Sequence, residues 1–217
     1  SVTSQFGYIT DGIFQNAQEV DNGVTQAGKG IGRLRWVDLN NDKKIDAYDQ
    51  DWLGTTLPDF EYGLNVELSY KNFTLSLFGQ GVSGRTVNDG NLGSTDFASG
   101  QGMNFGKRVL KAWTPQNPNS TIPMLSLVNR NSETRSSNYT LRNGSYFKMR
   151  NASLGYTLPS DLAQKIKVGF LRVYVAAENF LLIKAFGDDA FTGQDPETPG
   201  TVYPRPVTYT LGINITL

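Results

Sequence analysis

The sequence predicts an all-β protein, in which antiparallel strands form a segment of a transmembrane β-barrel with long extracellular loops. Three observations favour this fold class. Apolar and polar residues alternate in several stretches, short and long connections alternate between these stretches, and the longest stretches match the thickness of a bilayer.

The clearest alternation lies in residues 60–70, where every second side chain is apolar. The apolar members are Phe60, Tyr62, Leu64, Val66, Leu68 and Tyr70. After a polar break at Lys71 and Asn72, the residues Phe73, Leu75 and Leu77 resume the pattern. A period of two residues is typical of a strand with one apolar face, so the two stretches predict a hairpin.

The same period recurs in three later stretches, residues 151–158, 171–178 and 207–217. Residues 6–14 form a weaker sixth candidate. Lys148 and Arg150 have the parity of the apolar residues Ala152 and Leu154, so we expect these two cations to lie above the membrane. Six strands are too few to close a spanning barrel, which takes at least about eight. The chain is therefore expected to be part of a larger barrel.

The connections between the strands alternate in length. Residues 71–72 and 159–165 are short connections, whereas residues 82–145 and 183–206 are long. Transmembrane barrels have tight periplasmic turns and long external loops, and a compact soluble domain seldom has long loops between neighbouring strands. Counted back from a periplasmic C-terminus, every short connection falls on the periplasmic side.

Strand length agrees with a membrane span. A strand of about 11 residues at about 3.3 Å per residue is about 36 Å long, and a tilt of about 45° gives a rise of about 26 Å, close to an apolar band of about 25 Å. Alternation alone is also compatible with a soluble β-sandwich, in which the apolar faces point inward. The sandwich therefore stays open as an alternative at this point.

The composition excludes several classes of site. The chain has no cysteine and no histidine, which removes the usual zinc ligands, a cysteine nucleophile and a histidine general base. Its 20 basic and 20 acidic residues balance, so a nucleic-acid surface is not indicated. No stretch is long and apolar enough for a transmembrane helix, and the N-terminus lacks the pattern of a signal peptide.

Residues 38–49 have the spacing of a calcium-binding loop. The oxygen-bearing side chains that the spacing nominates are Asp38, Asn40, Asp42, Asp46 and Asp49, and Lys44 offers its backbone carbonyl. Ca²⁺ takes six to eight oxygen ligands, which such a loop can wrap around one ion. Lys43 stands where a glycine is usual, and Asp49 replaces the longer glutamate. The alternative is a metal-free turn, since Asp and Asn side chains readily bond their own backbone.

The roles predicted for other charged and aromatic residues are less specific. Four charged residues, Glu61, Glu67, Arg172 and Glu178, have the parity of the polar face and are expected to face an aqueous lumen. Trp36, Trp52 and Trp113 fall in the expected loops, where they can anchor the loop or stack on a sugar or a partner. No pair of carboxylates has a spacing that indicates glycoside hydrolysis.

Several segments, taken in order, resemble the SusC/RagA-type TonB-dependent outer-membrane transporters, and the resemblance covers nearly the whole chain. The residues that carry it are 7–15, 35–42 continuing to Asp49, Gly54 with Pro58, 62–65, 78–81, 112–115, 150–159, 173–179 and 203–206.

The resemblance implies that residues 1–217 are the C-terminal portion, the last six or so strands, of a 22-stranded barrel. It also implies an N-terminal plug that contacts TonB, a SusD-like surface lipoprotein as lid, and uptake of oligosaccharides or peptides across the outer membrane of a Gram-negative bacterium. We expect no covalent chemistry. The plug and a signal peptide have no counterpart in these residues. The alternative is a secreted calcium-binding β-sandwich that binds carbohydrate.

Overall fold

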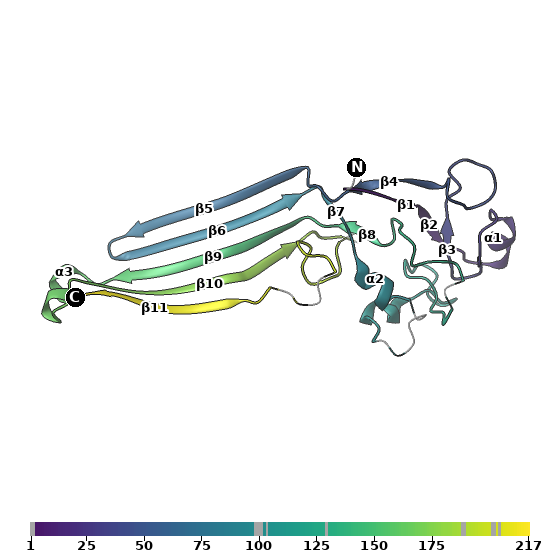
Figure 1. Cartoon of the computed structure of the whole chain (residues 1–217). Helices are drawn as coiled ribbons and strands as arrows, with labels where there is room; N and C mark the ends of the chain where they lie inside the picture. The colour runs from purple at the N-terminus through teal and green to yellow at the C-terminus, as the bar shows by residue number, and fades with distance from the viewer. Residues whose placement is uncertain are drawn as a thin grey trace. The chain divides into compact units, whose positions relative to one another are not determined.

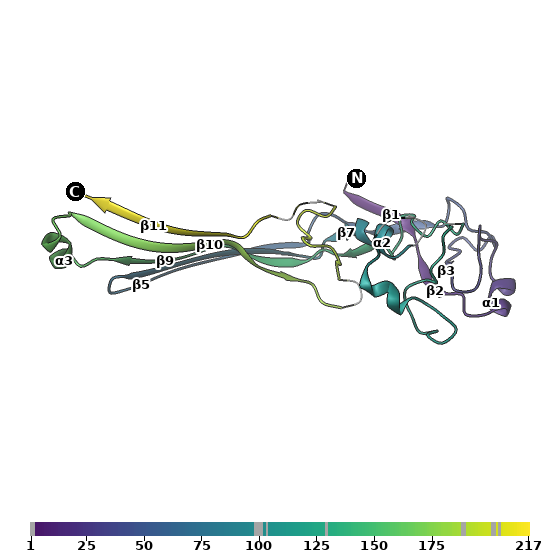
Figure 2. The same cartoon turned by 90° about the horizontal axis from the view of Figure 1, so that it is seen from below.

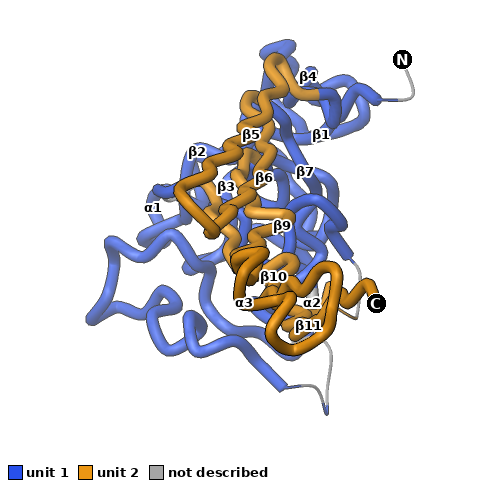
Figure 3. The backbone as a smooth tube through the Cα atoms, turned by 90° about the vertical axis from the view of Figure 1, so that its left-hand side faces the viewer, with its two compact units in different colours: residues 1–57, 85–144, 186–200 blue, residues 58–84, 145–185, 201–217 orange. Residues whose placement is uncertain are grey.

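The computed structural model describes residues 3–97, 102, 104–128, 130–187, 190–200, 203 and 205–217. The chain divides into two compact units, each assembled from three separate segments (Figure 3). Unit 1 contains residues 1–57, 85–144 and 186–200, and unit 2 contains residues 58–84, 145–185 and 201–217. None of the described helices is long and apolar enough to cross a membrane.

Unit 2 is built on one five-stranded antiparallel sheet with the order β11-β10-β9-β6-β5 (Figure 1). Its strands are β5 (Phe60–Tyr70), β6 (Phe73–Ser83), β9 (Tyr146–Thr157), β10 (Phe170–Lys184) and β11 (Thr208–Thr216). The view in Figure 2 shows that the sheet is twisted and bowed, as right-handed strands require. All five predicted strands are therefore present, and β9 and β10 extend well beyond the predicted stretches.

The short connections of unit 2 lie at one end of the sheet, together with the C-terminus (Figure 1). β5 and β6 are joined by a tight turn in which Lys71 has a φ of 52°. β9 and β10 are joined through the short helix α3 (Ser160–Lys165). Gly169 closes this end by donating its N–H to the carbonyl of Thr216 at 2.7 Å. The predicted alternation of short and long connections is thus confirmed.

The parity predicted for Lys148 was wrong, because a β-bulge interrupts the alternation in β9. Phe78 pairs with Asn151 and the next residue, Gly79, pairs with Met149, so the register between β6 and β9 skips Arg150. The register of β10 against β9 shifts at the same level, between Glu178 and Leu181. The extra residue moves Lys148 to the polar face and brings Met149 to the apolar face.

Unit 1 contains three two-stranded antiparallel sheets and short helices. The pairs are β1 (Ser4–Tyr8) with β4 (Gln50–Thr55), β2 (Thr10–Ile13) with β3 (Leu34–Trp36), and β7 (Thr86–Asn88) with β8 (Leu141–Asn143). The helical segments are α1 (Ala17–Asn22), α2 (Gly90–Thr95) and the 3₁₀ turn η1 (Lys107–Lys111). The predicted sixth strand, residues 6–14, is therefore two short strands of unit 1 and not a strand of the large sheet.

Unit 1 has a conventional buried core. Its members are Ile13, Leu34, Trp36, Leu92, Phe97, Trp113 and Tyr139, with Tyr8 and Ile45 packed against them. A buried polar cluster adjoins it: Arg33 forms an ion pair of 2.8 Å with Glu133, which also accepts the backbone N–H of Leu34 at 2.9 Å. Residues that the sequence places in separate loops therefore fold together as one body.

Candidate functional site

The candidate functional surface of unit 2 is the apolar face of the five-stranded sheet. Every strand contributes to it, and the register places the contributions side by side: Val66 pairs with Leu77, Leu75 with Leu154, and Val173 with Ile213. We define the apolar face as Leu64, Val66, Leu68, Leu75, Leu77, Leu154, Tyr156, Val173, Val175, Leu211, Ile213 and Ile215.

The side chains of the apolar face are not packed into a core. Leu64 is 49% exposed, Val175 49% and Ile213 59%. Isolated exposed apolar residues are ordinary on a soluble protein, but a continuous apolar surface across five strands marks a membrane or protein interface. This exposure also contradicts the alternative β-sandwich, which requires the same residues to meet in a dry interior.

Aromatic side chains gather near both ends of the apolar face. At one end Tyr62, Gly81 and Phe147 lie in one row across three strands, and the rings of Tyr62 and Phe147 stack at 6.1 Å over the glycine. Phe60 stacks on Tyr62 at 5.8 Å. At the opposite end the ring of Phe73 lies 4.8 Å from that of its strand neighbour Tyr156.

Gly81 makes the first aromatic row possible. A Cβ atom at this position would overlap the ring of Tyr62 and lie 2.6 Å from the carbonyl oxygen of Tyr146. Because glycine has no side chain, the Tyr62 ring can lie flat across β6 and reach Phe147. The sequence pattern did not reveal this row, since it depends on the register of three strands.

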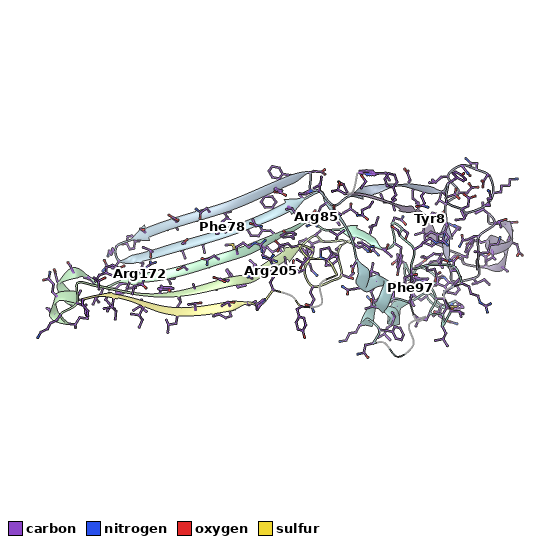
Figure 4. All side chains as sticks on the ribbon, in the orientation of Figure 1. Tyr8, Phe78, Arg85, Phe97, Arg172 and Arg205 are labelled. Atoms are coloured by element: carbon purple, nitrogen blue, oxygen red, sulfur yellow. The ribbon has the colours of Figure 1, made fainter. Side chains whose placement is uncertain are left out.

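The opposite face of the sheet is mainly polar. The four charged residues predicted for it, Glu61, Glu67, Arg172 and Glu178, all have its register parity. Arg172, labelled in Figure 4, donates a hydrogen bond of 3.1 Å to Thr74 and lies over Gly155. Phe78, also labelled there, is an apolar exception on this face.

In the candidate calcium loop of unit 1, the acidic side chains accept hydrogen bonds from backbone N–H groups of the same loop. Asp38 accepts the N–H groups of Asn41 at 2.7 Å and Lys43 at 2.8 Å. Asp49 is fully buried and accepts the N–H groups of Leu39 at 2.9 Å and Asp46 at 2.7 Å. Carboxylates bonded in this way supply the turn with the hydrogen bonds that its backbone needs.

A lysine partly neutralises the loop. The Nζ of Lys44 lies 2.7 Å from a carboxylate oxygen of Asp46 and 3.5 Å from one of Asp42. The hydrogen bond from Lys44 lowers the pKa of Asp46, and the same bond raises the pKa of Lys44. Asn40, the remaining predicted ligand, accepts the N–H of Asp42 at 3.0 Å.

The donor set of this loop suits Ca²⁺ by chemical type, and Lys43 adopts a φ of 68°, the left-handed conformation that a glycine usually takes. However, no three acidic side chains converge to hold a metal ion in the part of the chain that the structure describes, which includes residues 38–49. The geometry is that of a self-bonded turn, and calcium binding stays a prediction.

The three tryptophans differ in exposure. Trp36 and Trp113 are buried in the core of unit 1, and the indole N–H of Trp113 donates to Gln15 at 2.7 Å. Trp52 on β4 is 55% exposed. The interpretation as loop anchors therefore holds for Trp36 and Trp113, and Trp52 alone of the three can contact a ligand or partner.

No family model matches the chain. Two proteins of Formosa agariphila are similar to it over nearly its whole length. TonB-dependent receptor P3 is 29% identical over 234 aligned residues, covering 99% of this chain and 22% of the receptor. TonB-dependent receptor P26 is 29% identical over 215 residues, covering 94% of this chain and 22% of the receptor. The chain thus spans 22% of the length of these relatives.

Solved structures of a peptide importer have the same fold. The structure of the RagAB peptide transporter superposes with a TM-score of 0.76 at 23% identity, covering 98% of this chain and 22% of that one. The RagAB peptide importer in its open-open state gives a TM-score of 0.73 at 23% identity, with the same coverage of both chains. The resemblance to TonB-dependent transporters of the SusC/RagA type is confirmed, and the open five-stranded sheet has the fold of the matching part of the RagAB transporter.

Proposed function

We propose that this chain supplies part of the barrel wall and external loops of a TonB-dependent importer of the SusC type in the outer membrane. The observation that carries the proposal is the exposed apolar face, which runs across all five strands of unit 2. Exposing this apolar surface to water is energetically unfavourable, whereas contact with the hydrocarbon of a bilayer is favourable.

The aromatic residues support the same placement. Barrel proteins have rings of aromatic side chains at both membrane interfaces, and β5 has Phe60 and Tyr62 near one end and Tyr70 at the other. From Phe60 to Tyr70 the strand advances about 33 Å, which a tilt of about 40° reduces to a rise of about 25 Å. This rise equals the height of the apolar band in an outer-membrane barrel.

The remaining parts of the proposal concern the intact transporter. Unit 1 contains both long connections of the sheet and the segment before β5, so in this topology it supplies external surface. A SusD-like lipoprotein is the proposed lid, and TonB is proposed to act through a plug that these residues do not supply. The cargo is an oligosaccharide or a peptide. The likeness to RagAB, a peptide transporter, favours a peptide, and the likeness to two TonB-dependent receptors supports TonB dependence.

Cell fractionation tests membrane residence. In cells that make the protein carrying this sequence, we expect it in the outer-membrane fraction, resistant to salt and alkaline extraction and released by detergent. Recovery of a folded, monomeric protein from the soluble fraction without detergent contradicts the proposal. Deletion of the gene for its lid partner should then reduce uptake of the cargo without moving the barrel out of the membrane.

A further inference from the structure

Unit 1 contains a cavity of about 400 Å³ that the proposed transport function does not use. It is lined by residues from β2, β3, η1, β8 and the loop segments before β8, all within unit 1. Its volume lies in the range of small-molecule sites, about 300 to 1,000 Å³. Ile13 and Leu34 give it an apolar wall, while the side chains of Arg108 and Arg142 give it two cations.

The two arginines have different partners. The Nε of Arg108 lies 3.3 Å from a carboxylate oxygen of Asp96, which also accepts the hydroxyl of Tyr139 at 2.7 Å. Arg142 lies over the Tyr139 ring, with its guanidinium carbon 5.5 Å from the ring centre. The Nε of Arg142 is buried and has no hydrogen-bond partner among the described residues.

In the described part of the chain, the two arginines of the cavity are not both matched by a carboxylate that is free to pair with them. Burial lowers the pKa of Arg142, and the nearby positive charge of Arg108 lowers it further. Of the two acidic groups nearest to Arg142, Asp96 is already bound by Tyr139 and Arg108, and Asp89 accepts the hydroxyl and the N–H of Thr192, both at 2.6 Å. Arg142 therefore forms no ion pair of its own in the described residues, and a partly buried cation of this kind is stabilised by an added anion.

We infer that this cavity binds a small solute through a carboxylate group held by Arg108 and Arg142. The planar fork of a guanidinium matches the two oxygens of a carboxylate and bonds them in parallel. The apolar wall formed by Ile13 and Leu34 and the ring of Tyr139 accommodate the body of the solute. Peptides carry such a group at the C-terminus and acidic sugars carry it on the ring. The inference concerns unit 1 alone and stands independently of transport.

Equilibrium binding to the full chain in detergent tests the inference, with four probes in two matched pairs. The first pair is acetyl-alanyl-alanine and its C-terminal amide, and the second is glucuronic acid and glucose. We expect at least one acid to bind and its neutral counterpart not to bind. The acid that binds identifies the source of the carboxylate. If neither acid binds better than its neutral counterpart, the inference is wrong.

Arg142→Gln is the decisive variant, and Arg130→Gln is its control because Arg130 is exposed and does not line the cavity. We expect Arg142→Gln to weaken binding of the acid about tenfold or more, in line with the loss of a charge-assisted bidentate pair. The same variant removes a partly buried cation whose Nε has no hydrogen-bond partner in the described residues, so its melting temperature without ligand should not fall. Equal weakening by Arg130→Gln indicates attraction to overall charge and overturns the site.

Discussion

The two units of this chain bury their apolar residues in opposite ways. In unit 1, Leu34, Trp36 and Leu92 are almost fully buried in a common core. In unit 2, residues of the same chemical type, such as Leu211 and Ile213, are 72% and 59% exposed. Unit 1 therefore buries its apolar side chains in a core, as proteins in water do. Unit 2 exposes them on one face of its sheet, as barrel strands in a bilayer do.

Composition alone therefore does not indicate whether a segment lies in water or in the bilayer. The sheet and the loop unit share one chain with low charge and many aromatic residues, yet only the sheet has a period of two that continues from strand to strand.

Truncation of a core aromatic should have the largest effect, and only in unit 1. Trp36→Ala removes a side chain that is 2% exposed, so we expect a loss of about 3 to 5 kcal/mol in the stability of this unit. Limited proteolysis of unit 1 in detergent measures the effect. Trp52→Ala is the control, because Trp52 is 55% exposed and its loss should change little.

A charge on the apolar face should be the next largest effect. Leu154→Arg places a cation between Leu75 and Val175, at an expected cost of about 2 to 4 kcal/mol in the bilayer. Ser153→Arg, one residue away on the polar face, should be tolerated. The yield of heat-modifiable folded barrel in the membrane fraction measures both. Equal losses in the two variants contradict the assignment of faces.

Filling the glycine of the aromatic row should cost less. In Gly81→Ala the new methyl group meets the Tyr62 ring and the Tyr146 carbonyl, and such overpacking costs about 1 to 3 kcal/mol. Gly63→Ala is the matched control, since its Cβ would meet nothing closer than 3.8 Å. Denaturant unfolding in detergent compares the two. A stable Gly81→Ala variant would show that the row contributes little.

A pH effect is expected in unit 1. Burial raises the pKa of Asp96 above its usual value of 3.8, even though bonds from Tyr139 and Arg108 favour the charged form. The folded state then holds this proton to higher pH than the unfolded state does. Its contribution to stability is full below about pH 3.8 and is lost as the pH rises through the raised pKa. Asp96→Asn should remove this loss, measured as the difference between the melting temperatures of the two proteins across the pH range.

Calcium removal should have the smallest effect. The carboxylates of Asp38 and Asp49 already accept backbone N–H groups, so the turn has internal support without an ion. If the loop binds Ca²⁺ as the spacing predicts, a chelator lowers the melting temperature of unit 1, and Asp38→Asn abolishes that difference. An unchanged melting temperature favours the metal-free turn.

The sequence predicted the sheet well because each strand carries its own signal. The range of β5, Phe60–Tyr70, agrees with the predicted stretch, and the tight turn at Lys71 falls where the polar break lies. Unit 1 was not predicted as a folded body. Its core joins Ile13, Leu34 and Trp113, which lie far apart in the chain and within segments whose periodicity is weak or absent.

The candidate sites follow the same division. The parity of Glu67 and Arg172 could be read from alternation, and the turn at residues 38–49 from local spacing. The cavity of unit 1 could not be read in this way, because Arg108 on η1 and Arg142 on β8 are far apart in the chain and line the same cavity only in the folded unit. Contacts between distant segments leave no spacing to recognise.

The β-bulge at Arg150 keeps the apolar side chains of β9 on one face although the sequence changes its phase there. Below it, Ala152, Leu154 and Tyr156 point to the apolar side, and above it Phe147 and Met149 do so in the opposite phase. If the side chains alternated strictly between the two faces along β9, the apolar face would end at this point and Lys148 would face the lipid. If Arg150 instead took a regular place in the ladder, inside and outside would be exchanged for the upper part of the strand, so the skipped position at Arg150 is as necessary to β9 as its composition.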